Sequence, residues 1–113
     1  MFLFLFVLAA VAQEKDAVKI IDKVEFKSAI EANRVQLVDV RTPDEYKSGY
    51  ITYAINIDFL NPEYFSKAIQ ALDKEKPVYL YCHSGGRSHK AAILLEEMGF
   101  KEIYDLKGGY SEW

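Results

Sequence analysis

The sequence has a single cysteine, Cys82, among its 113 residues. One thiol excludes an internal disulfide framework and a metal cluster held by several cysteines. Runs of like charge are also missing and the formal net charge is only −3, so neither nucleic acid nor an anionic membrane surface is an expected partner. Half of the residues are hydrophobic, which excludes a disordered chain and suffices for the core of one domain. The role of Cys82 is therefore the central question.

A long apolar run occurs only at the start of the chain, and it ends in Ala10-Val11-Ala12. This small-x-small pattern is typical of a signal-peptide cleavage site. The run is shorter than the ~20 residues that span a bilayer, so no stable membrane span is predicted. No Lys or Arg precedes the run, which is consistent with a truncated start, and an additional buried strand is the alternative. We predict that residues 1–12 are an export signal to the bacterial periplasm; without a signal the protein would be cytoplasmic.

After this leader, short apolar segments alternate with helical patterns, which predicts an α/β fold. Helices are expected after the N-caps Asp22 (with Glu25 completing a capping box) and Thr42, over residues 63–72, and from Arg87 to a left-handed Gly99. A short last helix follows Gly108-Gly109. The expected strands are residues 18–21, 36–40, 54–57, 78–81 and 102–106. This alternation predicts a doubly wound parallel five-stranded sheet flanked by helices, with function at the carboxyl ends of the strands.

Cys82 follows the fourth expected strand and opens a loop with the sequence Cys82-His83-Ser84-Gly85-Gly86-Arg87-Ser88. A strand-to-helix turn of this kind directs backbone N–H groups and the positive end of the helix dipole toward its centre. Gly85 and Gly86 allow the positive φ angles that a curled loop needs. We therefore expect the thiol to ionise more readily than a free cysteine, and the basic residues nearby favour an anionic substrate.

Each of these residues also has a purely structural interpretation. A free cysteine is often a small buried hydrophobic residue. His83 and His89 suit exposed polar positions, because two histidines and one cysteine at these spacings lack a fourth metal ligand; no metal site is predicted. For Arg87, bracing the loop through a carboxylate is at least as good an interpretation as contact with a substrate.

Three motifs in matching order resemble the rhodanese-like sulfurtransferase family. Residues 37–46 (LVDVRTPDEY) resemble its first motif, residues 79–88 (YLYCHSGGRS) its active-site loop, and residues 108–113 (GGYSEW) its closing motif. The resemblance implies one rhodanese-like domain over residues 18–113 and an enzyme of the thiosulfate sulfurtransferase type that needs no cofactor. Cys82 would take a sulfane sulfur from a small anionic donor such as thiosulfate, hold it as a persulfide, and pass it to an external thiol or cyanide.

The resemblance also assigns roles within the loop. The backbone amides of His83, Ser84, Gly85, Gly86 and Arg87 would bind the persulfide, and Arg87 would order the loop or attract the donor. Three further residues are expected to support the loop, with an ion pair between strand-end side chains as its anchor: Asp39, Arg41 and Ser88.

The length of the loop favours a sulfurtransferase over related enzymes with a similar loop. Four residues lie between Cys82 and Arg87, whereas related phosphatases of the cell-cycle type carry five, so a phosphatase or arsenate reductase is the weaker alternative. A non-catalytic rhodanese module for protein binding or sensing would usually lack the cysteine, and a thiol oxidoreductase would need a second one. Tyr50 and Tyr53 depart from the family, which usually has a histidine and a glycine at these positions, and their role stays open.

Overall fold

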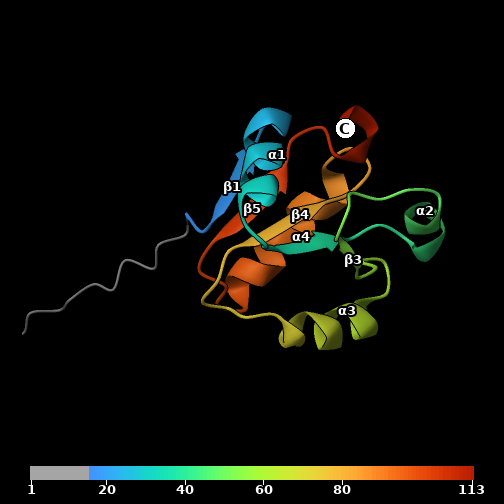
Figure 1. The fold of residues 1–113 in the computed structure, drawn as a ribbon. Helices are drawn as coiled ribbons and strands as arrows, with labels where there is room; N and C mark the ends of the chain where they lie inside the picture. The colour runs from blue at the N-terminus through green and yellow to red at the C-terminus, as the bar shows by residue number, and fades with distance from the viewer. Residues whose placement is uncertain (1–15) are drawn as a thin grey trace, which may run out of the picture.

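The computed structural model describes residues 16–113, and the export signal predicted at residues 1–12 lies outside them. The strands form one sheet in the order β1-β5-β4-β2-β3, and all neighbouring strands are parallel (Figure 1). Their bounds are β1 Val18–Ile21, β2 Gln36–Asp39, β3 Ile55–Asn56, β4 Val78–Tyr81 and β5 Ile103–Leu106. The predicted five-stranded parallel sheet is therefore confirmed.

Helices cover both faces of this sheet, with α1 on one face and α3 and α4 on the other (Figure 1). Their bounds are α1 Lys23–Ala32, α2 Pro43–Lys47, α3 Pro62–Ala68 and α4 Gly86–Glu97, with short 3-10 helices η1 at Ile69–Ala71 and η2 at Tyr110–Glu112. None of the helices within residues 16–113 is long and apolar enough to cross a membrane.

The helix ends follow the capping chemistry of the sequence. The Asp22 side chain accepts a hydrogen bond of 2.8 Å from the Glu25 N–H at the start of α1, although the return bond of the predicted capping box is not formed there. At α2 the box is complete, because Thr42 and Glu45 each bond the backbone N–H of the other. As predicted, α4 is followed by a left-handed glycine, Gly99, with a φ of 94°.

Several boundaries differ from the prediction. β2 and β5 are each one residue shorter than the predicted strands over residues 36–40 and 102–106. β3 is shorter than expected because it is an edge strand that pairs only with β2, over two residue pairs. The helix expected over residues 63–72 changes from α to 3-10 at Ile69. Helix α4 begins at Gly86 rather than Arg87. Gly86 is therefore helical, and of the two loop glycines only Gly85 has a positive φ, 117°.

The core consists of two clusters, one on each face of the sheet. The cluster under α3 and α4 includes Val38, Leu80 and Cys82, and the cluster under α1 includes Phe26 and Tyr81. All four residues of β4 are buried, since this central strand is covered on both faces. Cys82 therefore directly follows the most buried strand of the sheet.

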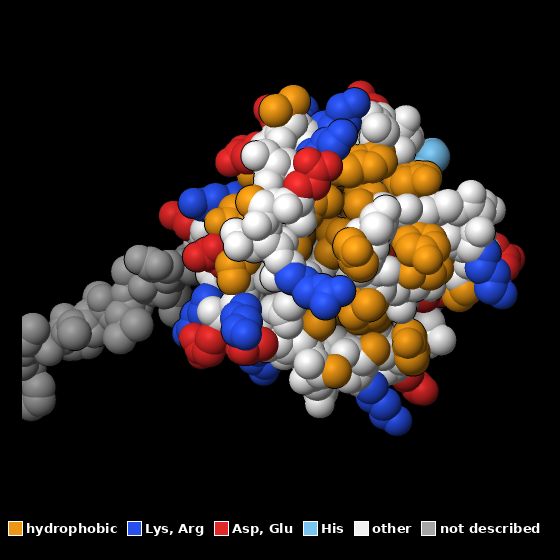
Figure 2. Space-filling view, in the orientation of Figure 1, with side chains coloured by type: hydrophobic (Ala, Val, Ile, Leu, Met, Phe, Trp, Pro, Cys, Tyr) orange, Lys and Arg blue, Asp and Glu red, His pale blue; other side chains and the backbone are white. Residues whose placement is uncertain are grey.

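Figure 2 shows hydrophobic side chains at the surface beside α1, flanked by charged groups.

Candidate active site

Cys82 directly follows β4, so that its sulfur lies at the carboxyl edge of the sheet, where the sequence predicted function. Its side chain is buried. The neighbouring strand β2 is held beside it, because the Val40 N–H donates to the Tyr81 carbonyl over 3.0 Å. Two buried carboxylates, Asp39 of β2 and Asp105 of β5, lie at the same edge on either side of β4. Cys82 therefore follows the central strand, and the strands on either side of it carry these two carboxylates.

The loop after Cys82 surrounds its sulfur with hydrogen-bond donors. The Gly85 N–H donates to Sγ over 3.0 Å, which the left-handed conformation of Gly85 makes possible. Burial by itself would raise the pKa of the thiol. Hydrogen bonds from the Ser88 hydroxyl and from the N–H groups of Ser88, Gly85 and Ser84 outweigh it, and the pKa of Cys82 is lowered. The site thus favours a negatively charged sulfur.

Arg87 braces this loop through a carboxylate. Its Nη1 and Nη2 donate to Oε1 and Oε2 of Glu45 over 2.7 and 2.9 Å. The Arg87 hydrogen bond, together with those of Thr42, lowers the pKa of Glu45 from 4.5 to about 2 against the effect of burial. A paired fork of this kind fixes direction as well as charge, so the start of α4 is tied to α2. Sequence reasoning anticipated a bracing carboxylate but did not identify it.

Asp39 and Arg41 form the expected ion pair, with 2.7 Å between Oδ2 and Nη2. Arg41 also donates to the Gly49 carbonyl over 2.6 Å, and its guanidinium lies 4.3 Å from the ring centre of Tyr110. Among the hydrogen bonds of residues 16–113, none joins this pair to the loop at residues 83–87. The pair therefore anchors the turn after α2, and its support of the Cys82 loop stays a prediction.

The closing motif holds the first residues of the loop. The Tyr110 N–H donates to the Cys82 carbonyl over 2.8 Å, and the Ser111 N–H donates to the His83 carbonyl over 2.9 Å. A Cβ atom at Gly109 would lie 2.5 Å from the Cys82 carbonyl oxygen, so only glycine permits this approach. In the sequence, the two adjacent glycines before Tyr110 were the available signal of a close backbone approach. They did not indicate which segment is approached, because Cys82 and His83 are remote in the sequence.

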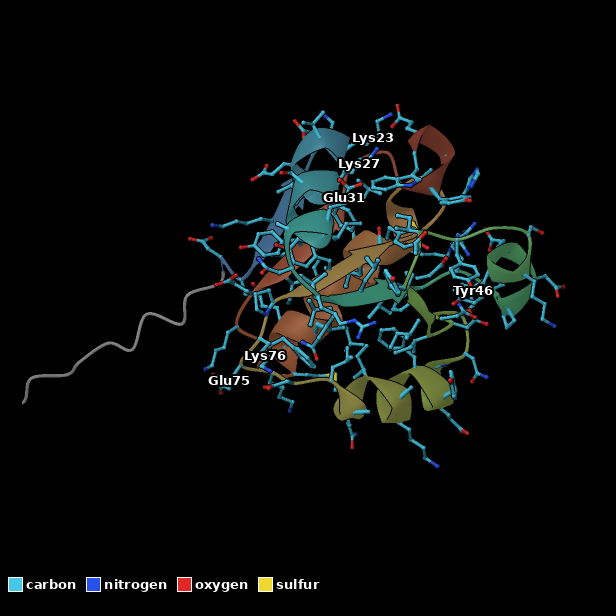
Figure 3. The ribbon with its side chains drawn as sticks, in the orientation of Figure 1. Lys23, Lys27, Glu31, Tyr46, Glu75 and Lys76 are labelled. Carbon is cyan, nitrogen blue, oxygen red and sulfur yellow. The ribbon has the colours of Figure 1, made fainter. Side chains whose placement is uncertain are left out.

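The two unassigned tyrosines belong to the turn between α2 and β3. Tyr50 stacks on Tyr46 with 4.0 Å between ring centres, and Tyr46 lies on the side of α2 that faces β3 (Figure 3). Tyr53 has a φ of 72°, a conformation that favours glycine, and its exposed ring lies under the Arg34 guanidinium at 5.3 Å. Both residues therefore shape this turn, and neither is part of the donor ring around Sγ.

The remaining loop residues face outward. His83, Ser84 and Gly86 are exposed, whereas Ser88 is fully buried beneath the loop. His89 is half exposed, with Nδ1 3.8 Å from Oδ2 of Asp105, a residue that sequence reasoning missed. Within residues 16–113 no group of three or more His, Cys, Asp or Glu side chains is arranged to hold a metal ion.

Comparison with known proteins points to one family. The profile of the rhodanese-like domain matches residues 22–113. The chain is 38% identical over 96 residues to the thiosulfate sulfurtransferase GlpE of Coxiella burnetii, covering 84% of this chain and 86% of that protein. It is 35% identical over 109 residues to the uncharacterized protein YqhL of Bacillus subtilis, covering 96% of this chain and 82% of that protein.

Solved structures agree with these sequence matches. The crystal structure of a rhodanese-like domain protein from Staphylococcus aureus superposes with a TM-score of 0.75 at 32% identity, covering 84% of this chain and 90% of that one. The human single-domain sulfurtransferase TSTD1 superposes with a TM-score of 0.70 at 26% identity, covering 83% of this chain and 93% of that one. Both similarities cover more than four fifths of this chain.

Proposed function

The chain belongs to the rhodanese-like family, and on that premise we propose that it is a sulfurtransferase in which Cys82 carries the transferred sulfur as a persulfide. The observation that carries the proposal is the buried Cys82 sulfur, to which the Gly85 N–H donates a hydrogen bond over 3.0 Å. The same donors that lower the pKa of the thiol suit a second sulfur that bears negative charge. The similarity to proteins named thiosulfate sulfurtransferase supports thiosulfate, or a donor like it, as the substrate.

In the first step the Cys82 thiolate attacks the outer sulfur of thiosulfate. A bond forms between Sγ and that sulfur, while the bond between the two thiosulfate sulfurs breaks and sulfite leaves with its electron pair. The enzyme is left with a persulfide anion on Cys82. The Gly85 N–H, which donates to Sγ over 3.0 Å, supports the expectation that the loop amides stabilise this charge.

In the second step an external nucleophile attacks the terminal sulfur of the persulfide. With cyanide the product is thiocyanate, and with a thiolate it is a new persulfide; in both cases the Cys82 thiolate leaves with the bonding electrons and is regenerated. The acceptor must be external because Cys82 is the only cysteine of the chain. Since the Arg87 charge is already paired with Glu45, the loop amides are the main groups that bind the transferred sulfur.

The test is the formation of thiocyanate from thiosulfate and cyanide by the wild-type protein and by Cys82→Ser. Serine preserves the size and hydrogen bonding of the side chain but cannot form a persulfide. We expect turnover by the wild type and none by the variant, with matching circular dichroism spectra. A second variant, Ser66→Ala on α3, controls for the effect of handling and substitution alone. Retained turnover in folded Cys82→Ser would exclude the proposed mechanism.

A further inference from the structure

A pocket of about 490 Å³ lies beside the start of α4 and next to the outer strands β1 and β5. Its walls come from residues 84–86 of the loop, from the following part of α4, and from the end of β5 with the residues after it. This volume is within the range of small-ligand pockets, roughly 300–1,000 Å³. The pocket can therefore hold one small molecule, and the steps of sulfur transfer give it no role.

Asp105 of β5 is the most buried charged residue of the lining, with 2% of its surface exposed, and it forms the floor of the pocket. Its Oδ1 has no hydrogen-bond partner among residues 16–113. An unpaired oxygen of a buried carboxylate costs free energy, and natural proteins keep few of them. His89 does not satisfy the carboxylate, because its Nδ1 is 3.8 Å from Oδ2, too far for a hydrogen bond. The floor thus offers a negative charge to a ligand with N–H donors.

Two lysines stand at the rim of the same pocket. Lys90 on α4 and Lys107 after β5 both line it and are exposed to solvent. Neither ammonium group forms an ion pair within the described residues. These two groups repel a ligand that carries only a positive charge, and Asp105 repels one that carries only a negative charge. The pocket therefore favours a molecule that carries both charges, with the positive group inward and the negative group outward.

The rest of the lining can accept an aliphatic group and give access to the floor. Ile20 of β1 lines the pocket and is 55% exposed, so an apolar group placed on it would remove apolar surface from water. His89 is half exposed, and a side chain of this kind changes rotamer freely, so its ring can turn into solvent without a movement of the backbone. A ligand can then replace the ring next to the carboxylate.

We propose that this pocket binds the zwitterion of a small aliphatic α-amino acid. Its ammonium group binds Asp105, its carboxylate faces Lys90 and Lys107, and its side chain covers Ile20. The inference goes beyond sulfur transfer and does not depend on it. Because residues 84–86 line the pocket, a bound ligand changes the surroundings of their backbone amides, and binding can be observed there.

The experiment titrates the isotope-labelled full chain with L-leucine and follows the amide signals of residues 84–86 by nuclear magnetic resonance. Two matched probes each keep one charge of leucine: isoamylamine lacks the carboxylate, and isocaproate lacks the ammonium group. Burial raises the pKa of Asp105 to about 6, so the titrations are made at pH 7.5, where its carboxylate is ionised. No sulfur donor is present, so the result is independent of sulfur transfer.

We expect leucine to shift these signals in a saturable way and both probes to bind at least about tenfold more weakly. Asp105→Asn keeps the size of the side chain and should weaken leucine binding by a similar factor. Lys107→Gln, at the exposed rim, should weaken it by about threefold. Asp73→Asn and Lys67→Gln remove the same charges at exposed positions outside the pocket and should leave the affinity unchanged.

The comparison of leucine with its two probes needs only the wild type, so it holds even where a variant fails to fold. Leucine that causes no shift, or that binds no better than isoamylamine or isocaproate, would overturn the proposal. Equal leucine affinities in Asp105→Asn and Asp73→Asn, with circular dichroism showing both to be folded, would also overturn it.

Discussion

Asp39 and Asp105 occupy similar places on two strands of one sheet and have opposite surroundings. Each is buried at the carboxyl end of its strand and is followed two residues later by a basic residue, Arg41 or Lys107. Asp39 accepts hydrogen bonds from the Arg41 backbone N–H, Nε and Nη2. Among the described residues, Oδ1 of Asp105 has no hydrogen-bond partner. The hydrogen bonds of the Asp39 carboxylate are therefore satisfied by Arg41, whereas those of the Asp105 carboxylate are satisfied only in part.

The difference lies in the two bases. A guanidinium is planar and weakly hydrated, so Arg41 can stay buried against the rings of Tyr81 and Tyr110 while it binds a carboxylate with two nitrogens. An ammonium group is strongly hydrated, and Lys107 is exposed. Within the described residues, the same spacing of acid and base therefore yields an ion pair between Asp39 and Arg41 and none between Asp105 and Lys107.

The largest effect is expected from breaking the satisfied pair. Asp39→Asn removes the charge that neutralises the buried Arg41 guanidinium, and we expect the free energy of unfolding to fall by about 3–5 kcal/mol. Urea unfolding at pH 7 measures this change. Asp73→Asn, which makes the same substitution at an exposed position, should cost less than about 0.5 kcal/mol. A loss at Asp39 as small as that of the control would mean that the pair does not hold the framework.

Asp105→Asn, the corresponding substitution on β5, should raise the free energy of unfolding instead of lowering it. The folded protein holds the Asp105 proton more tightly than the unfolded chain, because burial raises the pKa from 3.8 to about 6. The wild type therefore loses stability as the pH rises from about 4 to about 6, and Asp105→Asn does not. We expect the variant's advantage to grow by about 3 kcal/mol over this interval. Parallel stability curves for the two proteins would contradict the assignment of Asp105 as an unpaired buried acid.

A smaller effect is expected at the partly exposed pair of Glu45 and Arg87, which lies between these two extremes. The pKa of Glu45 is lowered to about 2 from 4.5, so its stabilisation is complete above pH 4.5 and is lost as the pH falls toward 2. Solvent screening limits the cost of Glu45→Gln to about 1 kcal/mol at pH 7. Thermal unfolding of the wild type and Glu45→Gln should show a lower melting temperature for the variant at pH 7. At pH 2.5 the difference between the two melting temperatures should be smaller.

Glu31→Gln is the matched control for this prediction, because Glu31 is exposed on α1, away from α2 (Figure 3). The rate of thiocyanate formation by the two variants is a second measurement. Glu45→Gln should reduce it by loosening the start of α4, while Glu31→Gln should leave it unchanged. Equal activities in the two variants would show that Arg87 needs no partner to order the loop.

Local sequence patterns predicted the framework of the fold. Thr42 and Pro43 marked the start of α2, Gly99 marked the end of α4, and the alternation of apolar segments gave the parallel sheet. These signals act over a few residues, within reach of one helix turn or one strand. β3 was predicted less well, because its length depends on pairing with β2 and not on its own composition.

The candidate site was predicted only where it is local. The loop from Cys82 to Ser88 is continuous in sequence, and its glycines and the following helix indicated a favourable setting for a thiolate. Glu45 is 42 residues from Arg87, so no local sequence signal indicated its bond to the guanidinium. The fit of Gly109 against the Cys82 carbonyl, like the position of Asp105, depends on how distant strands meet.

The central claim is that the sulfur of Cys82 accepts a second sulfur, and intact-mass measurement tests it most directly. The protein is incubated with thiosulfate, freed of excess donor and weighed, and then treated with cyanide. We predict a gain of about 32 Da, the mass of one sulfur atom, that is absent in Cys82→Ser and is lost when cyanide is added. A folded wild-type protein that gains no mass, or a gain that persists in Cys82→Ser, would contradict the account.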